Sequence, residues 1–363
     1  MKASLFAALS LLFSGGTDPH PLDAGIAAIN SHRPEHLSGR SDDAEFLRRL
    51  SLDLLGYPPA AEEVLGFLDD PAPDKRAKKI DDVLSRPRFA DFWARRFAEV
   101  YFGNYHQPVF DIAPGLTSDT RRRLLRNFIA WLREEIDDDR PWPQIVRAMI
   151  TARGSTATTP QLAYKLSFYG DGHRQELKFA EGIPRHFLGI NLQCARCHDH
   201  PFDRWRTEHL QGFGAFNTRQ RAVRRVVEGV EQVEVHYDDA GEWTSRDAYA
   251  WTEGERAFVY PPRFLEFAAP ACADRADTLA AMMIGDPERR LSLSLGNRVW
   301  GWLIGRGVFE PVDDLNILHR PASQKLARAL IQVTGMGSLR EVVRGVCLSE
   351  AYQRPSAATA RCD

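Results

Sequence analysis

The sequence has little of three features that define common protein classes: cysteine, net charge and long apolar runs. Its five cysteines in 363 residues are an odd number, and too few for a disulfide-rich scaffold. The 47 basic and 49 acidic residues leave a formal charge of −2. Bulk charge therefore gives no reason to expect nucleic acid or an acidic membrane surface as a partner. No segment approaches the roughly 18 uninterrupted apolar residues of a membrane-spanning helix.

The common catalytic signatures are also missing. There is no G-x-S-x-G motif, no phosphate-binding P-loop and no dinucleotide-binding fingerprint. The carboxylates of residues 134–139 are typical of a solvated helix end rather than of a glycosidase pair. Hydrophobic residues make up 44% of the chain and charged residues 26%, which indicates a globular protein. At about 150 residues per domain, the length predicts two domains.

The first sixteen residues have the three parts of a secretory signal peptide. Lys2 supplies a positive charge, residues 3–13 are apolar apart from Ser4 and Ser10, and residues 14–16 are small. The apolar stretch is shorter than the roughly 20 residues that a spanning helix needs. We therefore expect a periplasmic or secreted protein with no transmembrane segment after signal cleavage.

The apolar periodicity predicts a mainly α fold with a small β-insert. We expect a linker over 17–40, a helical domain over 41–221, a β-rich insert over 222–270 and a second helical domain over 271–363. Residues 153–173 resemble an irregular loop that lines a pocket. In the insert, valines alternate with polar residues, and a turn signal covers 238–241. The predicted helices begin or end near Ser41, Gly56, Asp74, Pro87, Ser118, Asp137, Trp142, Ala152, Gln175, Leu192, Asp274, Leu291, Ile304, Ser323, Gln332, Leu339 and Leu348.

The most specific motif is C-x-x-C-H, formed by Cys194, Cys197 and His198. It is the attachment signature of c-type haem. Two thiols one turn apart can reach the two vinyl groups on one edge of the porphyrin, and the adjacent histidine can bind the iron. Covalent attachment requires an extracytoplasmic compartment in bacteria, which agrees with the signal peptide.

Nearby residues have expected supporting roles in a haem site. His200 and Asp203 would tune the iron, and Trp205 would pack against the haem edge. The second axial ligand stays open; a filled position predicts electron transfer, and an empty one predicts binding of a small-molecule oxidant such as peroxide. A redox partner protein is the other expected partner. The candidate second ligands are His106, His173, His186, His200, His236, His319, Met149, Met282, Met283 and Met336.

Two alternatives use the same residues. Cys194, Cys197, His198 and His200 could form a non-haem zinc or iron site, with His198 and His200 as the metal-binding imidazoles. Such a protein would be a hydrolase or binding module, with polysaccharide as a candidate partner. In the second alternative, Cys194 and Cys197 form a disulfide in a structural protein.

Several segments resemble a known family, the planctomycete-type cytochrome C-like domain (domain of unknown function 1549). The C-terminal part is similar to its companion, domain of unknown function 1553. The resemblance implies an extracytoplasmic protein whose biochemical activity is not settled. The matching segments are Phe46–Arg49, Asp53–Pro59, Asp74–Arg76, Arg88–Phe89, Trp93–Arg95 and Cys194–Trp205 for the first, and Asn297–Trp300, Gly305–Gly307, Glu310–Asp314 and Ser349–Gln353 for the second.

Overall fold

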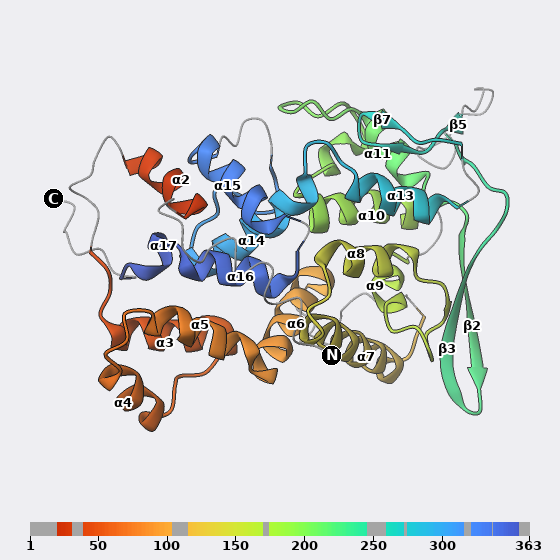
Figure 1. Cartoon of the computed structure of the whole chain (residues 1–363). Coiled ribbons are helices and arrows are strands. Elements are labelled where there is room, and N and C mark those ends of the chain that lie inside the picture. The colour runs from red at the N-terminus through yellow and green to blue at the C-terminus, as the bar shows by residue number, and fades with distance from the viewer. Residues whose placement is uncertain are drawn as a thin grey trace.

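Helices carry most of the described chain, as the apolar periodicity predicts. The computed structural model describes residues 20–30, 39–103, 115–169, 174–244, 259–271, 274–315, 321–335 and 337–355 (Figure 1). The predicted signal peptide lies outside these residues. The helices are α2 (Pro21–Asn30), α3 (Asp43–Leu55), α4 (Ala61–Asp69), α5 (Lys75–Ser85), α6 (Pro87–Phe102), α7 (Ser118–Asp137), α8 (Trp142–Thr151), α9 (Leu162–Leu166), α10 (Arg174–Ile183), the π-helix η2 (Pro184–Leu188), the 3-10 helix η3 (Gln193–Arg196), α11 (Thr207–Gly214), α13 (Arg275–Ile284), α14 (Arg290–Ile304), α15 (Gln324–Thr334), α16 (Leu339–Leu348) and α17 (Glu350–Gln353).

Local sequence signals account for several helix ends. At the start of α3, the carboxylate of Asp42 accepts a hydrogen bond from the backbone N–H of Glu45 at 2.7 Å. Gly56 ends that helix in the left-handed conformation, with a φ of 79°. For the long helix α7, the sequence predicts Ser118 or Asp119 as the cap, and this is wrong by one or two residues. The Thr117 side chain instead accepts the hydrogen bond from the backbone N–H of Thr120.

The predicted linker over 17–40 is wrong for the part that the structure describes. Residues 21–30 form α2, which lies beside α15 from the far end of the chain (Figure 1). Leu22 is fully buried, and a Cβ at Gly25 would lie 2.7 Å from the Leu326 Cα. The absence of a side chain at Gly25 thus permits close packing of α2 against α15, which the polar composition of this segment does not indicate.

The predicted irregular loop over 153–173 also contains regular structure. Strand β1 (Gly154–Ser155) is followed by α9, and every residue of α9 is buried, including Lys165. The ammonium of Lys165 donates to the carbonyl oxygen of Ala152 at 2.8 Å and also to the Tyr237 hydroxyl. Burial lowers the pKa of Lys165 well below its usual value. The small, polar composition therefore masked a helix that belongs to the core.

The β-rich segment is a long hairpin with short additional strands. Strand β2 (Gln220–Val227) pairs antiparallel with β3 (Val230–Tyr237), and β1 pairs with the other edge of β3. Glu228 and Gly229 make the two-residue turn with φ of 51° and 77°, the geometry that favours hairpins. The turn signal at 238–241 instead precedes β4. The short strands β4 (Trp243–Thr244) and β5 (Val259–Tyr260) pair with each other, as do β6 (Arg263–Phe264) and β7 (Phe267–Ala268).

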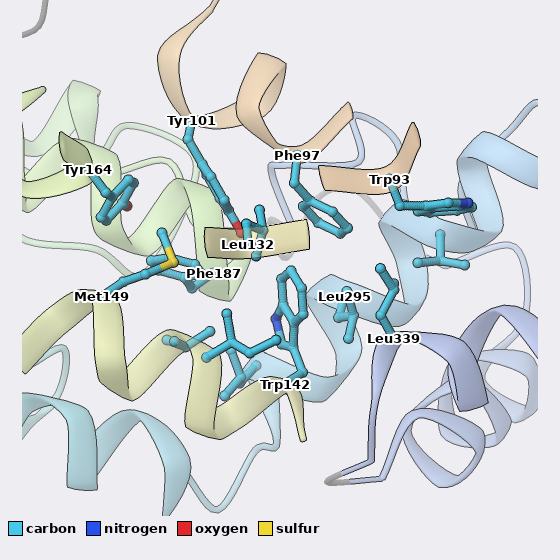
Figure 2. Close-up of a cluster of buried hydrophobic side chains, with 14 of the residues drawn as sticks. Trp93, Phe97, Tyr101, Leu132, Trp142, Met149, Tyr164, Phe187, Leu295 and Leu339 are labelled. Atoms are coloured by element: carbon cyan, nitrogen blue, oxygen red, sulfur yellow. The ribbon is translucent and has the colours of Figure 1, made fainter. Parts of the chain in front are cut away.

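A single hydrophobic core joins the two halves of the chain. Figure 2 shows aromatic side chains of α6, α8, α9 and η2 packed with Leu295 of α14 and Leu339 of α16. The rings of Phe97 and Trp142 lie 4.5 Å apart. Backbone bonds across the halves add to this packing, including Trp142 N–H to the Gly337 carbonyl at 2.9 Å. Helices long and apolar enough to cross a bilayer are absent from the described residues.

Candidate functional site

The C-x-x-C-H motif forms a short surface turn that follows η2. The Asn191 side chain accepts a bond from the backbone N–H of Gln193 at 3.1 Å, which starts the 3-10 helix η3. Within that helix Ala195 is fully buried, while Cys194 and Cys197 on either side are exposed. The buried alanine therefore anchors the turn and leaves both thiols at the surface. Both cysteines are free thiols in the structure.

The imidazole of His198 has one nitrogen engaged and one available. Its Nδ1 lies 2.8 Å from the backbone carbonyl oxygen of Asp199. A carbonyl oxygen only accepts, so Nδ1 must donate, and in the neutral imidazole the lone pair then lies on Nε2. The Asp199 carboxylate accepts in turn from the Thr207 backbone N–H at 2.9 Å, at the start of α11. The histidine and its carbonyl partner are thus held by a helix N-terminus.

His200 has the opposite arrangement. Its Nδ1 accepts from the backbone N–H of Phe202 at 3.2 Å, and the backbone N–H of His200 donates to the Trp205 carbonyl at 2.8 Å. The neutral ring therefore carries its proton on Nε2. With one nitrogen accepting and the other protonated, His200 stabilises the loop of residues 200–205 and offers no free lone pair to a metal.

The other two predicted site residues support the turn. The Asp203 carboxylate accepts from the N–H of Arg204, its neighbour in the chain, at 2.7 Å. Trp205 is 4% exposed, with the guanidinium of Arg204 4.8 Å from its ring centre and that of Arg290 at 5.9 Å. These cation–π contacts fix Trp205 beneath the loop.

An ion network connects this turn to α14 in the C-terminal half. Arg204 pairs with Glu288 at 2.9 Å, and Glu288 also pairs with the buried Arg290 at 2.9 Å. Arg290 reaches Asp286 at 2.7 Å and Glu266 at 2.8 Å. Burial raises the pKa of Asp286, although its bonds to Arg290 act against this. The loop that follows the cysteines therefore depends on residues about 85 positions later.

The four predicted ligands of the non-haem metal site all lie in the cysteine turn and the loop that follows it. Cys194, Cys197, His198 and His200 all belong to the described residues, and among these there is no group of three or more His, Cys, Asp or Glu side chains that could hold a metal ion. The engaged Nδ1 of His200 gives one physical reason. Of the proposed second axial ligands, His106, His173, His319 and Met336 lie outside the described residues.

Sequence reasoning missed a second polar cluster, which is buried where α6, η2 and α14 meet. It contains Tyr101, Tyr164, His186 and Arg298, of which the sequence analysis proposes only His186 as a ligand, for the second axial position. Its Nδ1 lies 3.0 Å from the Tyr164 hydroxyl. Burial, with the nearby charges of Arg298 and Arg185, lowers the pKa of His186 to about 3. The residues come from four separate segments, so no local spacing could have identified the cluster.

Comparison with known proteins places the chain in a family. Residues 21–221, from the first residue of α2 to the second residue of β2, match the family described as protein of unknown function (DUF1549), PSCyt2. The curated proteins and the solved structures contain no match. The matched region includes the C-x-x-C-H turn together with Tyr101 and His186, and it spans more than half of the chain. The chain therefore belongs to the DUF1549 (PSCyt2) family.

Proposed function

We propose that the chain is an extracytoplasmic c-type haem-binding protein that serves electron transfer or haem-dependent redox catalysis. Cys194 and Cys197 would attach the haem through thioether bonds, and His198 would bind the iron through Nε2. Haem bound there would supply reversible one-electron chemistry. The observation that carries the proposal is the hydrogen bond between His198 Nδ1 and the Asp199 carbonyl oxygen at 2.8 Å.

This bond supports iron ligation because of what it does to the ring. A metal-binding histidine commonly donates its other N–H to a carbonyl or carboxylate, which fixes both tautomer and orientation. His198 has that arrangement in the protein alone, and the lone pair of its neutral ring therefore lies on Nε2. The Asp199 side chain bonds to the Thr207 N–H, which holds the carbonyl in place.

The cysteines have the accessibility that attachment requires. Both thiols are free and exposed, and they lie in the same short turn as His198. A third thiol, Cys347, is fully buried, and burial raises its pKa well above the usual value. Within the part of the chain that the structure describes, two accessible thiols thus lie beside a histidine with an available nitrogen, while the buried thiol of Cys347 is chemically inert.

The geometry favours haem over the four-ligand metal site. A metal bound by His200 through Nδ1 would displace the N–H of Phe202, and binding through Nε2 would require another tautomer. We propose that His200, Asp203 and Trp205 support the turn from beneath. The redox partner, whether a protein or a small-molecule oxidant, would approach the exposed side of Cys194, Cys197 and His198.

Two further parts of the proposal rest on sequence motifs. The charged and apolar pattern of residues 2–16 supports export, and hence a compartment in which haem can be attached. The similarity of residues 297–300, 305–307 and 310–314 to domain of unknown function 1553 supports a companion domain over residues 271–363. One of these motif residues, Asn297, has a clear structural role. Its side-chain oxygen accepts from the Phe309 N–H at 2.9 Å, and its side-chain NH2 donates to the Phe309 carbonyl at 3.0 Å.

The test is expression of the full chain in a host with haem-maturation machinery. We expect a Soret band, and a mass increased by one covalently attached haem. Cys197→Ser should lose covalent attachment, and His198→Ala should keep the mass but change the spectrum of the reduced form. Carbon monoxide binding to the reduced protein then separates an open iron site from a filled one.

Two matched variants serve as controls. Cys347→Ala removes a buried thiol, and His200→Ala removes a histidine two positions from the proposed ligand; both should retain the covalent haem. A protein without a Soret band but with stoichiometric zinc or iron would refute the haem proposal in favour of a metal site. Absence of both, with unreactive Cys194 and Cys197, would identify a disulfide instead.

A further inference from the structure

Three buried hydrogen-bonding groups in and next to the second polar cluster have no partner among the described residues. They are the hydroxyl of Tyr101, the hydroxyl of Ser294 and the Nη2 atom of Arg298. The three residues are 5%, 1% and 7% exposed. Buried polar groups are normally satisfied, and each such exception calls for a physical explanation. Three exceptions in one place point to a missing partner that can accept several hydrogen bonds.

The three groups lie on elements that meet at η2. Ser294 and Arg298 are four residues apart on α14, and so share one face of that helix. Helix α14 packs on η2, and a Cβ at Gly189, just after η2, would lie 3.4 Å from the Ser294 Oγ. Tyr101 of α6 packs on the same element, with its ring centre 5.6 Å from those of His186 and Phe187. Figure 2 shows Tyr101 beside Tyr164 and Phe187 within the core.

The charges around this point do not balance. Arg298 acts electrostatically on both Tyr101 and His186, so the three side chains are close. The carboxylate that acts on Arg298 is that of Asp313, which already pairs with Arg185 at 2.6 Å. Among the side chains that the structure describes, two guanidinium groups thus share one carboxylate, and the low pKa of His186 means that it adds no charge at neutral pH. This excess of positive charge among the described side chains favours an anion.

We propose that Arg298, Tyr101 and Ser294 form a binding site for a small carboxylate. A guanidinium N–H and two hydroxyl groups supply donors for the two oxygens of a carboxylate, and the guanidinium supplies the opposite charge. The edge of the site reaches the surface at Arg185, which is exposed, and at His186, which is half-buried. Asn297, adjacent to Arg298, donates to backbone carbonyls of the loop before Asp313. These bonds hold α14 and that loop in a fixed relative position.

This proposal does not depend on haem. The C-x-x-C-H turn uses none of these side chains, and the carboxylate site draws Arg298 and Ser294 from the C-terminal half. Arg298 also belongs to the segment that resembles the companion domain, whereas Tyr101 lies in the matched DUF1549 region. The site is therefore complete only when both halves pack together.

The experiment is titration of the full chain with sodium acetate, with sodium chloride at equal ionic strength as the reference. Isothermal titration calorimetry should give saturable acetate binding to the wild type. Tyr101→Phe removes only an unpartnered hydroxyl, and should weaken acetate binding by roughly tenfold because one charge-assisted bond is lost. Tyr57→Phe, at an exposed tyrosine, is the matched control and should bind acetate as the wild type does.

A second variant separates binding from a structural role. Arg298→Met should abolish acetate binding without lowering the Tm of the acetate-free protein, because it removes a buried charge that lacks a hydrogen-bond partner at Nη2. Arg147→Met, at an exposed arginine paired with Asp277, should leave acetate binding unchanged. Equal heats for acetate and chloride, unchanged affinity in Tyr101→Phe, or a large loss of Tm in acetate-free Arg298→Met would each overturn the proposal.

Discussion

The exposed cysteine turn and the buried Tyr101–Arg298 cluster manage their polar groups in opposite ways. In the turn, short local bonds engage the side chains of Asp199, His200 and Asp203. In the cluster, the hydroxyl of Tyr101 and the Nη2 of Arg298 are buried without hydrogen-bond partners among the residues that the structure describes. An exposed site built from one segment can be satisfied by its own backbone. A buried site assembled from distant segments depends on the whole fold, and its unpartnered groups carry the information about a ligand.

The largest expected difference between the two regions involves a buried and a partly exposed asparagine. Asn297 is fully buried and bonds to the backbone of Phe309 and Val312. Asn297→Ala should cost about 2–3 kcal/mol of unfolding free energy, since it leaves buried backbone groups unpaired. Asn191→Ala in the cysteine turn removes one bond in an accessible place and should cost about 0.5–1 kcal/mol. Urea denaturation at pH 7 measures both; equal losses would contradict the comparison.

A pH titration tests the buried cluster alone. Burial and the charge of Arg298 lower the folded-state pKa of His186 to about 3, below the ordinary value of 6.5. Between these values the unfolded chain binds a proton at His186 that the native chain does not, so stability is complete above 6.5 and falls as the pH decreases toward 3. His186→Gln should reduce this slope by on the order of 1 kcal/mol per pH unit.

The measurement is urea denaturation of the wild type and His186→Gln across that pH range. Above pH 7.5 the stability of both proteins should change with pH in the same way, which serves as the internal control. Parallel pH profiles over the whole range would show that the native cluster tolerates a proton on His186.

The smallest effect is expected where the turn joins the C-terminal half. Arg204 and Glu288 are both nearly half exposed, so their pair at 2.9 Å is screened by water. Arg204→Ala should cost less than about 1 kcal/mol, and the cost should shrink further at high salt. Denaturation at two salt concentrations checks this. The control is Arg95→Ala, which removes the ion pair between Arg95 and Asp91 within α6. A loss that is large and independent of salt would show that Arg204 acts through its packing on Trp205.

The helices were predictable to within a few residues wherever caps and apolar spacing agree. Ser323 caps α15 and Asp274 caps α13 at the predicted positions, and Ser338, one residue before the predicted start at Leu339, caps α16. The misses have tertiary causes. Helix α2 is stabilised by contact with α15, and α9 by burial in the core, and neither contact leaves a mark in the local composition.

The site followed the same division. The C-x-x-C-H spacing placed Cys194, Cys197 and His198 in one turn, because neighbours in sequence are necessarily neighbours in space. It did not indicate that His200 uses its Nδ1 to hold the backbone of Phe202. That bond depends on the course of the loop over residues 200–205, which closes on the Trp205 carbonyl.

The sequence by itself determined the helical character, the position of the β-rich segment and the cysteine–histidine turn, since each depends on periodicity or spacing over a few residues. The tertiary structure alone decided that the two halves share one core, and that Tyr101, His186 and Arg298 meet. Their separations along the chain, 85 residues and 112 residues, exceed any local pattern. Such contacts form only because burial of apolar surface brings α6, η2 and α14 together. The polar side chains on these elements then lie close to one another.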